Sequence, residues 1–162
     1  MRIARPAPLL LAPLLIAAAA LLPGCTMARP FKVVAAPDPG GTVVVAVTHA
    51  QLRPDGSERF WKLTRGVLDA LPGHAGLHGY ALRRRISGDE AWTMTAWASE
   101  EAIAAFVRSP EHREAMRATG AVLAQARFAR FTIPAGEFPP TWERALAALA
   151  AENAGGADPP RP

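Results

Sequence analysis

Residues 91–113 read AWTMTAWASEEAIAAFVRSPEHR, and this stretch decides the fold. Its first part, 91–97, is rich in Trp and Thr, which favour a strand. Ser99 follows as a helix cap, and two glutamates lie in the first turn, where the positive helix end favours acidic groups. Pro110 starts a second helix, because proline at the first helical position loses no hydrogen bond. The stretch therefore predicts a strand followed by two consecutive helices.

Similar patterns extend outward from this stretch in both directions. Apolar β-branched runs predict strands, and apolar residues three or four positions apart predict helices. The expected strands are 42–49, 77–86, 91–97 and 126–133, and the expected helices are 57–71, 99–107, 109–119 and 140–152. Ser57 is expected to cap the first helix, and Gly120 is expected to end the third. The order βαββαβ with an extra C-terminal helix predicts an α+β ferredoxin-like fold, in which an antiparallel sheet carries helices on one face.

The other face of this sheet also carries large apolar side chains, so an isolated domain would expose an apolar patch. Trp92 and Trp97 lie five residues apart in one strand and must therefore point to opposite faces. His78, Tyr80 and Leu82 alternate along the second strand and are expected to share one face. We expect a ligand cavity on the face opposite the helices, with one of these two tryptophans in its wall.

The composition limits the class of protein. With 162 residues, half of them apolar, the chain is long enough for one folded domain and no more. The single cysteine, Cys25, excludes an intramolecular disulfide framework and a zinc site built from several thiolates.

The first 24 residues have the pattern of a secretory signal peptide, with two arginines, an apolar run and small residues in that order. Residues 22–25, Leu-Pro-Gly-Cys, resemble the bacterial lipobox. The resemblance implies cleavage before Cys25, lipidation of its sulfur and a membrane-anchored lipoprotein on the periplasmic side of a bacterial cell envelope. A plain signal peptide with an incidental cysteine and an uncleaved anchor are the alternatives.

The predicted organisation has four parts, which are a lipoprotein signal peptide (1–24), a flexible Pro/Gly/Ala-rich tether (25–41), the domain (42–152) and a disordered tail (153–162). Loss of the signal peptide removes two arginines, which leaves 16 basic and 14 acidic residues and a net charge of +2. This small charge and the expected export argue against a nucleic-acid partner.

Residues 95–106 and 109–113, with 79–83 before them, resemble the antibiotic biosynthesis monooxygenase family. Shared features are a strand that ends in Trp, a Ser-Glu-Glu cap, a Phe in the helix and a Ser-x-x-His restart. The resemblance implies a dimeric α+β barrel and hence a homodimer. The family includes oxygenases that use no cofactor. Haem-degrading relatives carry Trp and His where this chain has Phe106 and Met116, so the resemblance does not extend to haem.

Histidine is the natural proton carrier near neutral pH, so His49, His78 and His112 are the candidate catalytic residues. Tyr80 and Trp97 are the candidate substrate-binding residues, because aromatic rings stack on planar molecules. The histidines lack the close spacing of metal ligands, so we expect no metal and no cofactor. The structural alternatives are surface histidines and a tryptophan that only fills the core.

Two functions fit this sequence. The first is a lipid-anchored oxygenase that acts on a quinol or other aromatic substrate without a cofactor. The second is a non-catalytic envelope lipoprotein that binds a small apolar molecule or a partner. A buried His that converges on an aromatic wall would favour the enzyme, whereas a filled apolar interior would favour the second function.

Overall fold

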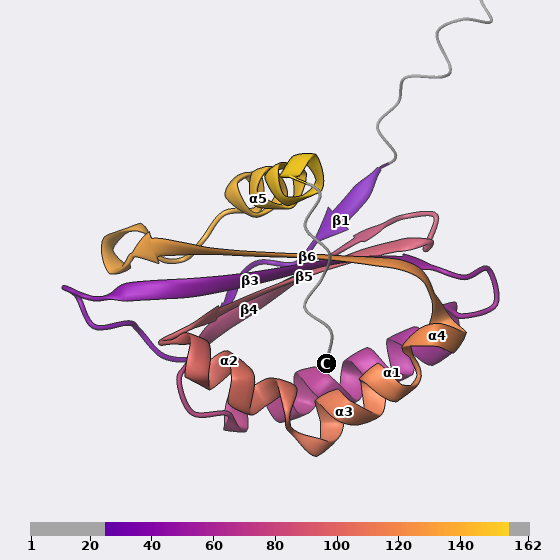
Figure 1. The fold of residues 1–162 in the computed structure, drawn as a ribbon, viewed down its shortest axis with the longest axis horizontal. Helices are drawn as coiled ribbons and strands as arrows, with labels where there is room; N and C mark the ends of the chain where they lie inside the picture. The colour runs from indigo at the N-terminus through magenta and orange to yellow at the C-terminus, as the bar shows by residue number, and fades with distance from the viewer. Residues whose placement is uncertain (1–24, 156–162) are drawn as a thin grey trace, which may run out of the picture.

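A computed structural model describes residues 25–155, which form one sheet with helices on both faces (Figure 1). The strands are β1 (Thr26–Ala28), β2 (Lys32–Val33), β3 (Thr42–Leu52), β4 (Leu77–Arg85), β5 (Glu90–Trp97) and β6 (Leu123–Pro134). The helices are α1 (Ser57–Ala70), α2 (Glu100–Val107), α3 (Pro110–Arg117), α4 (Thr119–Val122) and α5 (Trp142–Gly155), with 3-10 turns η2 (Leu71–Gly73) and η3 (Ala135–Glu137). The predicted signal peptide and residues 156–162 of the predicted tail lie outside the described residues.

The four long strands have the order β4-β5-β3-β6, and every neighbouring pair is antiparallel. With the helices between them, this is the βαββαβ topology expected from the sequence. The α+β ferredoxin-like fold and the extra C-terminal helix are therefore confirmed. β3 and β6 pair from Thr42 opposite Pro134 to Leu52 opposite Leu123, so these two strands are longer than predicted.

Two of the predicted helix signals are confirmed, and two are wrong. Ser99 accepts a hydrogen bond from the backbone of Ala102, and Pro110 occupies the first position of α3. Ser57 instead lies inside α1, and Gly56 before it makes no side-chain cap. A side chain at Gly56 would collide with the backbone of Val122, which explains the glycine. Gly120 lies within α4 rather than ending the helical segment.

Residues 25–41 differ from the predicted tether, because they add two short strands to the free edge of β4. Thr26 to Ala28 pair with Arg85 to Arg83, and β2 pairs with Tyr80 and Gly79. Any side chain at Gly79 would meet the ring of Phe31 and the carbonyl of Lys32, so glycine permits this close approach. The backbone groups of the β4 edge are satisfied within the chain, which removes an exposed edge.

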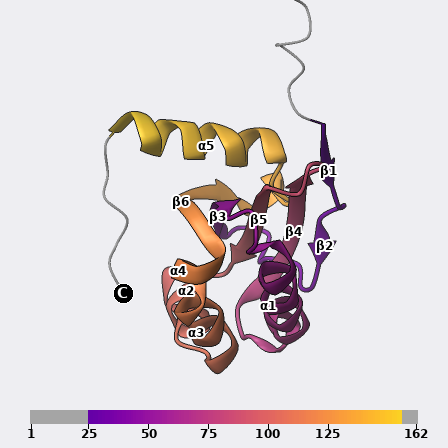
Figure 2. The ribbon, with the colours of Figure 1, turned by 90° about the vertical axis from the view of Figure 1, so that its right-hand side faces the viewer.

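Figure 2 shows α5 on one side of the sheet and α1, α2 and α3 on the other side, which we call the α5 side and the α1 side. Each side has its own core. The α5-side core is formed by Val43, Val45, Val47, Ala81, Trp92, Met94, Ala96, Ala129, Ile133, Ala145 and Leu149. The α1-side core is formed by Leu71, Leu77, Trp97, Ile103 and Phe106. α5 therefore covers the apolar face that the sequence analysis left open.

Candidate functional site

Trp92 and Trp97 lie on opposite faces of the sheet, as predicted, but with their expected positions exchanged. Trp97 has no exposed surface and lies in the α1-side core, under the helices. Trp92 belongs to the α5-side core. The expected cavity opposite the helices with Trp97 in its wall is therefore wrong. The alternation of side chains along β5 points Trp97 to the α1 side of the sheet.

Four rings meet on the α1 side, and we call them the aromatic cluster. Phe106 of α2 lies at its centre, with ring centroids 5.2 Å from Trp97, 4.9 Å from His112 and 5.1 Å from His74. Ser109 caps α3 through the His112 backbone, which fixes the turn that carries the His112 ring. β5, α2, α3 and the loop after η2 thus each supply one ring to the cluster.

Two buried nitrogen atoms in the aromatic cluster have no hydrogen-bond partner, namely Nε1 of Trp97 and Nδ1 of His112. An unpaired buried polar group costs stability, so such a pair in one cluster calls for an explanation. Burial lowers the pKa of His112 below its usual value near 6.5, and the nearby Val107 backbone opposes this shift only in part. The imidazole is therefore neutral at neutral pH and can accept a proton.

A groove of about 560 Å³ lies between α1 and α3. Its rim is charged and carries Asp55, Glu58, Arg59, Lys62, Glu111 and Glu114. Val67 lines the groove and also packs on the core that contains Trp97 and Phe106. Glu111, which lines the groove, directly precedes His112 in the chain, whereas the four rings of the aromatic cluster do not line the groove. A groove of this volume is in the usual range for small-molecule sites.

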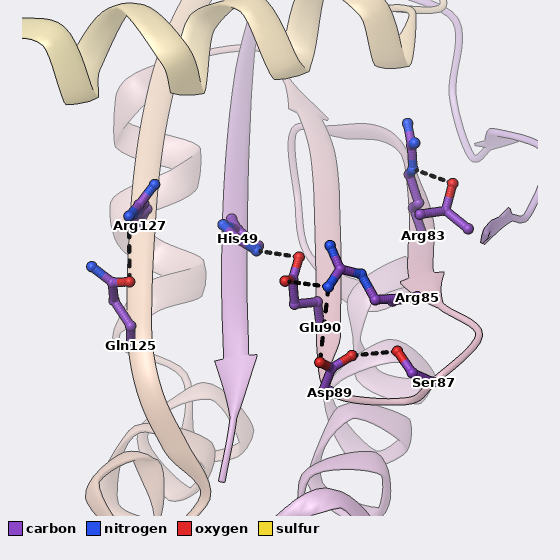
Figure 3. A network of polar contacts seen from close by, with 9 residues as sticks. His49, Arg83, Arg85, Ser87, Asp89, Glu90, Gln125 and Arg127 are labelled. Carbon is purple, nitrogen blue, oxygen red and sulfur yellow. Dashed lines mark hydrogen bonds and ion pairs between the residues drawn. The ribbon is translucent and has the colours of Figure 1, made fainter. Parts of the chain in front are cut away.

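His49 lies on the α5 side, away from the aromatic cluster. Its ring stacks on Trp92 with a centroid distance of 4.7 Å, and Arg83 lies over the same indole. Figure 3 shows the continuing network, in which Glu90 contacts both His49 at 3.2 Å and Arg85 at 3.1 Å. These groups largely satisfy one another, although Nε of Arg85 has no partner. The arrangement is typical of a structural ion-pair network.

His78 also lies apart from the aromatic cluster, under the N-terminal segment, and its Nδ1 is 3.2 Å from the carbonyl oxygen of Ala35. It lines a second hollow of about 260 Å³. Tyr80 packs instead against the α1-side core. The expected common face of His78 and Tyr80 is wrong, because the β4–β5 register shifts between Leu77 and Gly79.

The described residues 25–155 hold no group of three or more His, Cys, Asp or Glu side chains placed to bind a metal ion. Within the same range, none of the helices has the length and apolar character needed to cross a membrane. Of the five predicted site residues of the domain, the structure brings Tyr80, Trp97 and His112 to one side and leaves the other two histidines elsewhere.

Comparison with known proteins bears on this site. The profile of the family described as "Antibiotic biosynthesis monooxygenase" matches residues 43–118. Residues 43–118 are therefore similar to the antibiotic biosynthesis monooxygenase family. We call residues 43–118 the monooxygenase-type domain after this similarity. The matched region extends from β3 to α3 and includes all four rings of the aromatic cluster. No curated protein matches the sequence significantly.

Solved structures resemble the monooxygenase-type domain in fold. A protein from Nitrosomonas europaea that is named after the same family has a TM-score of 0.53 at 15% identity, over 62% of this chain and 96% of its own. PA3566 from Pseudomonas aeruginosa has a TM-score of 0.53 at 15% identity, over 57% and 94%. A protein from Lactobacillus acidophilus has a TM-score of 0.52 at 13% identity, over 59% of this chain but only 46% of its own length. Identities this low establish the fold alone.

The sequence analysis missed two members of the aromatic cluster. Phe106 was named only as part of the family resemblance, and no role was predicted for His74. Local signals predict the helix that carries Phe106 and the turn before His74. They do not predict which rings meet in the folded chain. The Ser109 cap beside His112 was the one local signal that fixed a ring of the cluster.

Proposed function

We propose that this monooxygenase-type protein binds a small planar aromatic molecule at the aromatic cluster and oxidises it with O₂ without a metal or cofactor. The observation that carries the proposal is the pair of buried, unpartnered nitrogens on Trp97 and His112 around one phenylalanine ring. A ligand with an aromatic ring and a hydroxyl group would stack in the cluster and supply the missing hydrogen-bond partners.

His112 supplies the proton-transfer step of this proposal. Its neutral imidazole takes the proton of a phenolic or quinol hydroxyl, and the apolar surroundings keep water from the resulting anion. The electron-rich anion then reduces O₂ directly. In an anthrone-type substrate, whose enol form carries that hydroxyl, one oxygen atom replaces both hydrogens of the ring methylene as a carbonyl. The methylene carbon supplies the four electrons, and the other oxygen atom leaves as water with two protons, one of which His112 returns.

An oxygen electrode tests the reaction with anthrone- and quinol-type compounds as probes. His112→Gln should lower kcat at least 100-fold with a smaller effect on ligand affinity, because general-base catalysis contributes about 10²–10⁴-fold. His78→Gln is the matched control, since His78 lies outside the aromatic cluster, and it should leave the rate unchanged. Ligand binding without oxygen uptake in the wild type would favour the non-catalytic binding protein.

We also propose that the protein is a lipoprotein of the bacterial envelope, anchored through Cys25. The leader pattern before Cys25 supports this, and Cys25 is exposed at the start of the described residues. Cys25→Ala should abolish incorporation of labelled fatty acid and leave the precursor uncleaved. Equal labelling of this variant and the wild type would contradict the anchor.

The homodimer stays a prediction. It rests on the family resemblance and on an apolar face expected to be open, and α5 covers part of that face with Ala145 and Leu149. The uncovered part of the α5 side carries the His49 network. Sedimentation of the protein in detergent at micromolar concentration would measure its state of association.

A further inference from the structure

Exposed apolar side chains gather where the N-terminal strands meet β4. Among the described residues, seven large apolar side chains are exposed, and four of them lie in this region. These four are Met27, Val33, Val34 and Ile86, with exposed fractions of 38–60%. We call residues 25–34 together with Arg84 and Ile86 the β1 edge. Figure 1 shows β1 beside the turn that joins β4 and β5.

The β1 edge is also basic. Residues 25–34 contain Arg29 and Lys32 and no acidic residue. Met27 lies directly opposite Arg84 in the β1–β4 ladder, so the two side chains leave the same face of the sheet. Neither Arg29 nor Arg84 takes part in an ion pair among the described residues. The nearby acidic groups of the β4–β5 turn are instead paired with Arg85.

Cys25, the predicted site of lipid attachment, lies directly at the β1 edge, and no flexible segment separates it from the sheet. The carbonyl of Cys25 accepts a hydrogen bond of 2.8 Å from the Ile86 amide, so the sheet begins at Cys25 itself. A free tether over 25–41 could instead separate the anchor and domain by about 50–60 Å when extended. A lipid on Cys25 would thus hold Ile86 and Met27 close to the bilayer.

We propose that the β1 edge rests on an anionic membrane surface, an orientation that depends on the lipid anchor of the proposed function. Met27 and Ile86 enter the interface, while Arg29 and Arg84 contact lipid phosphates. A lipid chain with a basic patch is a combination that gives stable membrane attachment. Each basic residue near such a surface strengthens its contact about fivefold.

Site-specific fluorescence in the full chain tests this orientation. Lipidation blocks the thiol of Cys25, so a single introduced cysteine can carry an environment-sensitive dye. Ile86→Cys and Met27→Cys probe the β1 edge, and Met116→Cys is the matched control, because Met116 is a similarly exposed apolar residue of α3. The labelled proteins are reconstituted in phosphatidylglycerol-containing vesicles with brominated lipids as quenchers.

We expect strong quenching at positions 27 and 86 and little at 116. Arg84→Ala should weaken the contact at position 86 about fivefold, and Arg113→Ala on α3 should not. Equal quenching at all three positions, or none at 27 and 86, would overturn the orientation. A free thiol at Cys25 in the wild type would instead contradict the anchor. In that case the label at position 86 in a Cys25→Ser background decides, with quenching in favour of the surface and its absence against it.

Discussion

Replacement of Trp92 by phenylalanine should lower stability more than replacement of Trp97, although Trp97 is the more deeply buried of the two. Trp97 is fully buried and Trp92 is 9% exposed, so burial alone predicts the larger loss at Trp97. In Trp97→Phe, the loss of about two buried ring carbons costs about 1.5 kcal/mol. The same change removes an unpaired buried N–H, which itself costs about 1–3 kcal/mol. The two effects nearly cancel.

No such relief exists for Trp92→Phe. The smaller ring loses a similar area, part of the stacking on His49 and part of the cation–π contact with Arg83. Stacking contributes about 0.5–1.5 kcal/mol and an exposed cation–π contact about 0.5–1 kcal/mol. We therefore expect a loss of about 2–3 kcal/mol for Trp92→Phe and less than about 1 kcal/mol for Trp97→Phe.

Urea unfolding followed by far-UV circular dichroism measures both values, and unchanged slopes would confirm that the unfolded states are comparable. A ligand titration of the same proteins should show weaker binding for Trp97→Phe alone. A loss above 2 kcal/mol for Trp97→Phe would show that its indole nitrogen has a partner in solution. That result would remove the observation on which the proposed function depends.

Three further predictions concern packing and charge. Leu149→Ala should lower the free energy of unfolding by about 2–4 kcal/mol, because Leu149 of α5 is 5% exposed; a change below 1 kcal/mol in urea unfolding would show that α5 is not docked. Glu90→Gln should cost about 1–3 kcal/mol, since His49 and Arg85 lose their shared carboxylate; Asp89→Asn, at a more exposed carboxylate, is the matched control. His112 binds fewer protons when folded, because its pKa is lowered, so stability should fall as the pH drops below about 6.5 and His112→Phe should flatten that slope; an unchanged slope in thermal melts between pH 7 and 5 would contradict the burial of this ring.

Local signals predicted the elements of the domain well. The β-branched runs placed β3 and β5 within three residues of their ends, and the Ser99 cap and Pro110 fixed the starts of two helices. These signals act within a few residues of chain, so the sequence alone contains them. The helix-to-strand order then left one common topology, which the sheet has.

The arrangement of the candidate site was less predictable because it depends on long-range pairing. A register shift before Gly79 changes which residues of β4 share a face, and no residue pattern marked it. The face for Trp97 was chosen from the family resemblance rather than from a contact. An apolar stripe on a helix shows that the helix packs but not on which side of a sheet, so the position of α5 could not be inferred.

Both ends of the described chain cover parts of the sheet that a four-stranded ferredoxin-like domain leaves open. α5 packs on one apolar face, and β1 and β2 pair with the free edge of β4. A second sheet could reach the α5-side core only if α5 moved away and exposed residues such as Val45 and Met94, which are now fully buried. That displacement costs the hydrophobic stabilisation of the helix, whereas the α1–α3 groove needs no such movement to open. The covered face therefore serves stability, and the proposed ligand site lies on the α1 side, where Trp97 and His112 each have a buried nitrogen without a partner.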